Sequence, residues 1–270
     1  MSLILRQTTE QQRRIDLRGI TPDRLADLEL PVIAQLPITV DNQQVPLSSH
    51  FTIEGTPSNE LSIIPINNRL DGIGAGMTHG NLHVTGDAGH HTGSAMQGGK
   101  LLVEGSCGDF TGSALQGGEL IVQGDAGDAT GAPLAGGLRG QNGGVIHIQG
   151  NAGDRTGECQ RRGLIIIEGD TGALTGYRMI AGTLYVGGRS GEQTGLNMRR
   201  GTILLRQRPT KLPITLNYNG ALPLTILSLL MRPLRQYLTK QTPPNSTAQH
   251  ADRYVGDVAC KGQGEIIILC

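Results

Sequence analysis

A tandem repeat of 19 residues is the feature that most constrains how this chain can fold. Two successive copies read GNLHVTGDAGHHTGSAMQG from Gly80 and GKLLVEGSCGDFTGSALQG from Gly99. Self-similarity at a short fixed period indicates stacked coils, in which each coil buries its apolar face against its neighbours. The spacing is 19 residues throughout, apart from one of 26 between the third and fourth copies, and the later copies begin at Gly118, Gly144, Gly163, Gly182 and, truncated, Gly201.

Aliphatic residues recur two and four places after each leading glycine. Alternate residues of a strand share a face, so these positions predict two inward ladders of parallel strands. The first ladder is Leu82, Leu101, Leu120, Ile146, Ile165, Leu184 and Ile203, and the second is Val84, Val103, Val122, Ile148, Ile167, Val186 and Leu205. The residues between them are expected to point outward: His83, Leu102, Ile121, His147, Ile166 and Tyr185. A third apolar column, broken at Gln160, is Met96, Leu115, Leu134, Met179 and Met198.

Glycine punctuates every copy, as is needed where a chain turns with positive φ or where stacked backbones approach closely. The chain has 41 glycines, no Trp and two Phe, which favours a thin aliphatic interior over an ordinary globular core. The predicted fold is mainly β: a right-handed parallel β-helix of about seven coils, on the order of 30 Å tall.

The flanks differ from the repeat in composition, so we divide the chain into an N-terminal α/β cap (1–55), the repeat domain (56–208) and a C-terminal extension (209–270). In the cap, short strands are expected at residues 3–5 and 15–17. A helix is expected from Pro22, with Thr21 as its N-cap, and a second helix after Pro31.

In the extension, Pro209 and Pro213 end the repeat. Residues 222–240 then predict one or two short helices, broken at Pro233, that form a cap over the last coil or a partner-facing arm. Residues 241–250 are polar and predict a linker, and residues 265–269 predict a strand that pairs along an edge or with another subunit.

Charge and cysteine content narrow the function classes. With 23 basic and 23 acidic residues, the chain has no bulk charge to favour nucleic acid or an anionic membrane. Residues 222–231 form the longest apolar stretch, which is too short to span a bilayer, and the N-terminal residues do not resemble a signal peptide. Four cysteines without a CxxC pair fit a reducing cytoplasm.

Two polar columns at the turns raise the question of catalysis or metal binding. Stacked carboxylates can bind calcium or act as an acid/base pair, but Asp and Asn also serve as ordinary turn residues. We favour the turn interpretation, because any column of repeated copies shows such an alignment. The columns are Asp87, Ser106, Asp125, Asn151, Asp170 and Arg189, and His90, Asp109, Asp128, Asp154, Ala173 and Glu192.

Histidines 79, 83, 90 and 91 are close in sequence and are candidate metal ligands, although isolated surface histidines are commoner. The sequence contains no nucleophile elbow, Walker loop or zinc signature. We therefore assign no catalytic residue and no metal ligand.

A group of arginines gathers positive charge toward the C-terminal end of the repeat. Arg161-Arg162 and Arg199-Arg200 occupy the same two places of coils that lie two apart, about 10 Å from each other. Arg178 and Arg189 come from neighbouring coils. These six arginines are candidates for binding an anionic partner, either an acidic subunit surface or a polyglutamate tail, and the alternative is a solvated corner.

The seven extra residues of the longer spacing lie between Ala132 and Gly143. An insertion in one coil maps to one place on the surface of the stack, often a contact loop. We favour a partner-docking role over a tolerated bulge.

The repeat core G-x-x-G-x-x-x-G, as in GDAGHHTG from Gly86, resembles the glycine-repeat β-helix of the glutamate synthase large subunit and the C subunit of formylmethanofuran dehydrogenase. The flanking segments TPDRLADL, from Thr21, and RYVGDVACKGQGEI, from Arg253, resemble the C subunit. The best agreement is with the version found in the formyltransferase/hydrolase complex, and the resemblance covers nearly the whole chain.

That resemblance implies a non-catalytic scaffold subunit. The complex would move a formyl group from tetrahydromethanopterin to a methanofuran-type carrier and hydrolyse it to formate. Its partners would be the hydrolase, formyltransferase and B-type subunits, with no cofactor on this chain. Two alternatives stay open: the C subunit of a molybdenum or tungsten formylmethanofuran dehydrogenase, and a stand-alone solenoid enzyme that acts on a glycan or acyl group.

Overall fold

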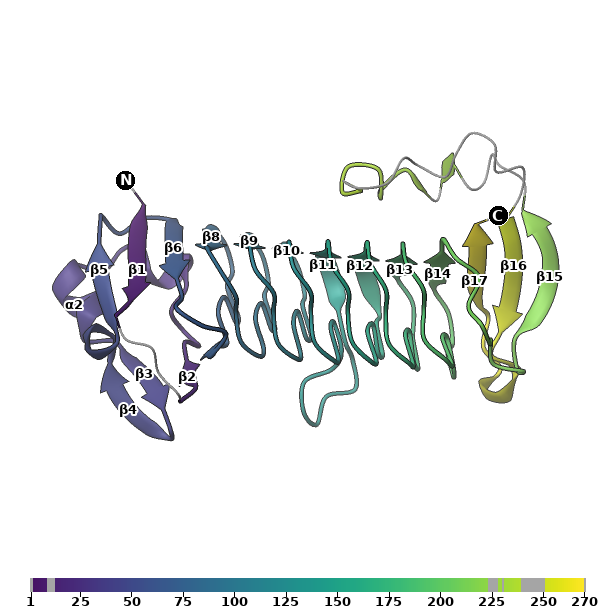
Figure 1. Ribbon diagram of the computed structural model, residues 1–270, viewed down its shortest axis with the longest axis horizontal. Coiled ribbons are helices and arrows are strands. Elements are labelled where there is room, and N and C mark those ends of the chain that lie inside the picture. Colours follow the sequence, from purple (N-terminus) through teal and green to yellow (C-terminus); the bar gives the residue numbers. More distant parts are fainter. Residues whose placement is uncertain (1, 9–12, 223–227, 230, 239–250, 270) are drawn as a thin grey trace.

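The computed structural model describes residues 2–8, 13–222, 228–229, 231–238 and 251–269, and within them the protein is mainly β with few helices. A mostly parallel sheet of 13 strands runs through its length in the order β15-β16-β17-β14-β13-β12-β11-β10-β9-β8-β6-β1-β5 (Figure 1). A second sheet has the order β4-β3-β2-β7. The described helices are short, and none of them is long and apolar enough to cross a membrane.

The strands of the repeat pair in parallel at equivalent positions of successive copies. Leu82 pairs with Leu101, and Leu101 with Leu120, so the repeat period sets the register. Both predicted inward ladders are confirmed, because all fourteen of their side chains are buried. The strands are β8 (Asn81–Val84), β9 (Lys100–Val103), β10 (Glu119–Val122), β11 (Asn142–Ile148), β12 (Arg162–Ile167), β13 (Thr183–Val186) and β14 (Thr202–Leu205).

The rest of each copy also stacks on the next. Bridges join Cys107, Ala126, Ala152, Thr171 and Ser190 in series, and backbone hydrogen bonds continue around the return connection. Gly176 shows why glycine recurs there: its φ is +68°, and a Cβ would lie 2.5 Å from Cδ1 of Ile203, which belongs to the copy that begins at Gly201. A side chain at this position would be both strained and obstructed.

At the N-terminal end, β1 (Leu3–Gln7) lies between β6 (Glu60–Ile64) and the edge strand β5 (Phe51–Glu54). The predicted early strands and the helix start at Pro22 are confirmed, and the second helix begins at Leu30, just before its predicted start. Thr21 occupies the N-cap position of α1, although its side chain makes no capping hydrogen bond. The remaining elements are β2 (Ile15–Asp16), α1 (Pro22–Leu25), α2 (Leu30–Ala34), β3 (Pro37–Val40), β4 (Gln43–Pro46), the 3-10 turn η1 (Leu47–Ser49) and β7 (Leu70–Asp71).

At the other end, the last strand in the chain covers the edge of the repeat. β17 (Gly264–Leu269) pairs in parallel with β14, which confirms the predicted edge pairing, and then pairs with β16 (Ala251–Gly256) in antiparallel fashion. β15 (Asn217–Leu222) forms the outer edge. The 3-10 turn η2 (Val258–Cys260) connects β16 to β17.

The described part of the predicted helical segment, residues 228–229 and 231–238, lies along the outer face of the sheet rather than over its end (Figure 1). We call it the arm. Met231 and Leu234 of the arm pack with Ile166, Tyr185 and Leu204 in a second core cluster. Ile166 and Tyr185, which lie between the ladders and were expected to point outward into solvent, are therefore buried under the arm. His83, Leu102 and Ile121, farther along the same face, stay partly exposed.

The third apolar column differs from the prediction at the insertion. Leu134 does not continue the third apolar column; it lies partly exposed in the inserted loop, and Gln141 takes the inward place. Gln141 and Gln160 are fully buried, and Gln160 Nε2 donates to Gln141 Oε1 at 2.9 Å. The chain returns to the stack later than the spacing of apolar residues suggests.

Candidate functional site

The first polar column forms a hydrogen-bonded ladder between copies. Asp87 Oδ1 accepts from the backbone N–H of Ser106 at 2.8 Å, and Asp125 Oδ1 accepts from that of Asn151 at 2.6 Å. Ser106 Oγ, Asn151 Oδ1 and Asp170 Oδ1 each accept from the next copy in the same way. Each side chain thus satisfies a backbone donor of the following turn.

The second column repeats this arrangement. Asp109, Asp128 and Asp154 each accept from the backbone N–H one copy ahead, at 2.7 to 2.9 Å. The ladder begins at Asp71, whose Oδ1 accepts from the N–H of His90 and whose carboxylate binds the Arg14 guanidinium. These bonds support the turn interpretation, because one oxygen of each of these aspartates accepts a hydrogen bond from the backbone.

His83, His90 and His91, which were considered as metal ligands, each make a separate contact. His90 Nδ1 accepts from the N–H of Asp109, so its proton sits on Nε2 when the ring is neutral. His83 Nε2 lies 2.9 Å from Glu104 Oε1, and His91 stacks on Phe110 with ring centroids 5.0 Å apart. Among the described residues, no three His, Cys, Asp or Glu side chains are placed to hold a metal ion.

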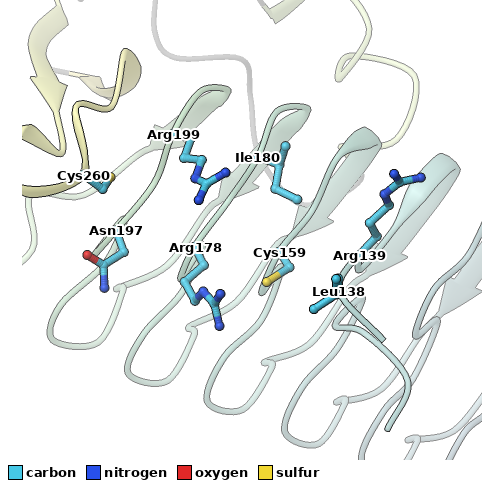
Figure 2. A pocket seen from close by; sticks show the side chains of 8 residues that line it. All are labelled: Leu138, Arg139, Cys159, Arg178, Ile180, Asn197, Arg199 and Cys260. Carbon is cyan, nitrogen blue, oxygen red and sulfur yellow. The ribbon is translucent and has the colours of Figure 1, made fainter. Parts of the chain in front are cut away.

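Two of the candidate arginines meet at a surface pocket of about 380 Å³. Arg178 and Arg199 project from successive coils, with Ile180 beside them (Figure 2). Arg139, on the inserted loop, closes one end together with Leu138, and Cys260 of η2 closes the other. Residues from the repeat, the insertion and the C-terminal extension therefore build one site, and Cys159 and Asn197, which stand on either side of Arg178 in the same row, also line it.

The other candidate arginines do not line this pocket. Arg161 lies in the same column as Ile180 and Arg199, one coil before Ile180. Its backbone N–H donates to Gln141 O. Arg162 begins β12, and Arg200 follows Arg199 at an exposed corner. Arg189 lies in the first turn column, where its N–H bonds to Asp170 Oδ1. The structure thus divides the predicted group of six.

The pocket is electropositive and lacks internal compensation. Arg139, Arg178 and Arg199 form no ion pair or side-chain hydrogen bond with any described residue. Burial raises the pKa of the Cys159 thiol, as does the nearby Glu158, while Arg178 and Arg199 oppose the rise. The Cys159 thiol is therefore a neutral part of the lining, and the arrangement can bind an anion.

Sequence reasoning missed Arg139, Asn197 and Cys260 as members of this site. Arg139 lies in the insertion, where the repeat spacing does not indicate the position of a residue. Cys260 lies more than fifty residues after the repeat and reaches the site because the chain reverses direction. Arg139 could have been suggested from the sequence, because it is a basic residue within an insertion that was expected to be a contact loop.

A second polar feature lies under the arm. His147 Nε2 lies 2.8 Å from Glu168 Oε1, and both side chains are buried. Tyr237 of the arm packs edge-on against the His147 ring, with centroids 5.7 Å apart. A pocket of about 280 Å³ opens beside them, lined by Lys100, Glu119 and Tyr237 among others. The aromatic contact ties the arm to the buried pair.

Comparison with known proteins places the chain in a family. Residues 81–222 match the family model described as the GXGXG motif, and the chain belongs to that family. A search of curated proteins finds no match. The described fold is shared by a chain in the crystal structure of the formyltransferase/hydrolase complex (FhcABCD) from Methylorubrum extorquens with methylofuran, at 34% identity over 99% of both chains and a TM-score of 0.90.

Proposed function

We propose that this chain is the scaffold subunit of a formyltransferase/hydrolase complex. The observation that carries the proposal is full-length similarity, in sequence and structure, to a chain of such a complex. The polar columns support a frame rather than a catalyst, because their side chains bond to the backbone of the next copy. In this proposal, the repeat is a right-handed parallel β-helix of about seven coils (56–208), between a cap (1–55) and an extension (209–270).

The complex would transfer a formyl group from formyl-tetrahydromethanopterin to a methanofuran-type carrier and hydrolyse it to formate. The related complex was crystallised with methylofuran, which is consistent with a carrier of that class. The hydrolase, formyltransferase and B-type subunits would carry the chemistry, in the cytoplasm, and this chain would hold them at a fixed separation. Parallel strands paired along the whole repeat suit that role, since stacked coils resist bending.

The arginine pocket is proposed as the anion-binding part of the scaffold. Its three uncompensated guanidinium groups favour a carboxylate-bearing group, either on an acidic subunit surface or on the polyglutamate tail of a carrier. Arg161, Arg162, Arg189 and Arg200 would extend the positive field around it.

Co-expression with the candidate partner subunits tests the proposal. The complete complex should assemble and catalyse formyl transfer and formate release, and omission of this chain should leave the other subunits unjoined. Assembly and full activity without it would contradict the scaffold function. Co-purification with molybdenum or tungsten and iron–sulfur subunits would instead indicate a formylmethanofuran dehydrogenase.

A further inference from the structure

We propose that one side of the molecule docks a protein partner through a segment that carries carboxylates next to an apolar side chain. This side, here called the lateral face, runs from Leu138 and Arg139 of the insertion, across Arg178 and Arg199, to Leu196 and Ile214. The proposal rests on the scaffold function and specifies the surface and the chemistry of one partner.

Apolar side chains at both ends of the lateral face are unusually exposed. Ile214 is 94% exposed and Leu138 is 81% exposed, the two highest values among the large hydrophobic residues that the structure describes. Val258, in η2 beside Thr215, is 53% exposed. Single exposed hydrophobic residues are ordinary, but several gathered beside pockets mark an interaction surface.

A second, largely apolar pocket lies next to the arginine pocket. It has a volume of about 270 Å³, and its lining includes Leu196, Leu212, Pro213 and Ile214. The two pockets adjoin, because Leu196 lines one and its neighbour Asn197 lines the other. The turn η2 is fixed at their junction, where the N–H of Val258 donates to Thr215 O at 3.1 Å. An apolar anchor and an anionic group of one segment can therefore be held together.

The charge on the lateral face is one-sided although the whole chain is neutral. Arg139, Arg178, Arg199 and Lys211 line the two pockets against one carboxylate, that of Glu192. Arginine combined with apolar side chains is the composition that protein interfaces favour, and an acidic segment complements it.

The apolar ends argue for a protein over a free anionic chain. A hydrophilic polyanion would use the guanidinium groups and leave Leu138 and Ile214 in water. A folded partner covers both ends and excludes water from the arginines, which strengthens each ion pair. The inserted loop supports the same conclusion, because it places Leu138 and Arg139 at the rim of the pocket.

The test compares variants of the full chain, co-expressed with the formyltransferase and hydrolase subunits. One variant reverses charge (Arg178→Glu with Arg199→Glu), and another removes the apolar ends (Leu138→Ser with Ile214→Ser). The matched control is Arg6→Glu with Arg155→Glu: both side chains are exposed and line neither pocket, and Arg155, at φ +56°, shares the backbone conformation of Arg178 at φ +52°. Subunit stoichiometry, association at rising salt and bound carrier are measured.

Both lateral-face variants should weaken association with one subunit by about tenfold or more, as expected for hot-spot residues, while the control assembles normally. A photo-crosslinker at position 138 should join an Asp- or Glu-bearing segment of that subunit. Unchanged assembly of both variants overturns the docking proposal and leaves the scaffold function standing. Normal assembly with loss of bound carrier also overturns it, in favour of a carrier site.

If the wild-type chain does not assemble with these subunits, the scaffold function itself fails. The crosslink then decides the docking proposal in the protein's native host. A crosslink to an acidic segment of another protein, lost on Arg178→Glu with Arg199→Glu, supports docking, and its absence overturns it.

Discussion

His147 and Glu168 repeat, in buried form, the pair that His83 and Glu104 make at the surface. In both pairs a ring Nε2 meets a carboxylate Oε1 of the residue 21 positions later, at 2.8 Å and 2.9 Å. The His147 and Glu168 side chains are 3% and 1% exposed, against 38% and 47% for the surface pair. The arm accounts for the difference, since Tyr237 packs on the His147 ring.

The two pairs make a matched experiment on burial. His147→Ala should lower the free energy of unfolding by about 2–4 kcal/mol, because it removes a partner of a buried carboxylate and leaves a cavity under the arm. His83→Ala should cost less than about 1 kcal/mol, because water solvates the exposed Glu104. Urea unfolding of both variants measures the difference, and equal losses would contradict the role given to the arm.

The aspartate ladders predict that an oxygen acceptor matters and that charge does not. Asp128→Ala should cost about 1 kcal/mol, because the N–H of Asp154 loses its acceptor. Asp128→Asn retains the oxygen and should be nearly neutral. Thermal unfolding with calcium and with a chelator checks this: a large loss in the Asn variant, or stabilisation by calcium, would indicate a cation site.

The hydrogen bond between the buried amides of Gln141 and Gln160 predicts that substitutions at the two positions have non-additive effects on stability. Gln160→Met matches Met179 and Met198 of the same column, but it leaves Gln141 Oε1 without the donor that it has now. The single variant should therefore lose about 1–2 kcal/mol, and adding Gln141→Met should recover most of that loss. A double-mutant cycle by chemical unfolding measures the coupling, and simple additivity would contradict it.

The lowered pKa of Asp257 predicts how the free energy of unfolding depends on pH. It is buried, and although burial alone would raise its pKa, donation from the N–H groups of Asn197 and Ala259 lowers the pKa below 3.8. The folded state thus binds this proton less readily than the unfolded state, so the stabilisation is present above about pH 3.8 and lost as pH falls through the folded pKa.

Asp257→Asn should therefore lower stability near neutral pH by about 1–3 kcal/mol and flatten its decline in acid. Unfolding measured from neutral pH down to about pH 3 tests both effects. The exposed Asp154→Asn variant, which keeps its ladder oxygen, serves as the control. A decline as steep as that of the wild type would assign the acid sensitivity to other groups.

The sequence predicted the parts of the fold that depend on local periodicity. The ladders at Leu82 and Val84 follow from strand alternation and a constant spacing, and the turn role of Asp128 follows from residue type. The burial of Ile166 and Tyr185 could not be predicted in this way, because the segment that covers them lies far away in the chain. Gln141 was missed because periodicity does not show where an insertion rejoins the stack.

The candidate site was predictable only in part, for a related reason. Arg178 and Arg199 stand in neighbouring columns of the repeat, so their proximity follows from the spacing. Arg139 and Cys260 join them through a loop and a chain reversal that have no period. Arg189 was grouped with them because it comes from a neighbouring coil, but one coil spans several corners and Arg189 lies at a different corner.

The order of the last strands has a consequence for synthesis on the ribosome. β17 occupies the edge of β14 in the sheet, yet it is translated only after β15 and β16. Coils can stack as they emerge, but the edge of β14 stays open, and able to pair with another nascent chain, until residues 264–269 arrive. Polypeptides that terminate early should therefore aggregate through this edge even though every complete coil in them has formed.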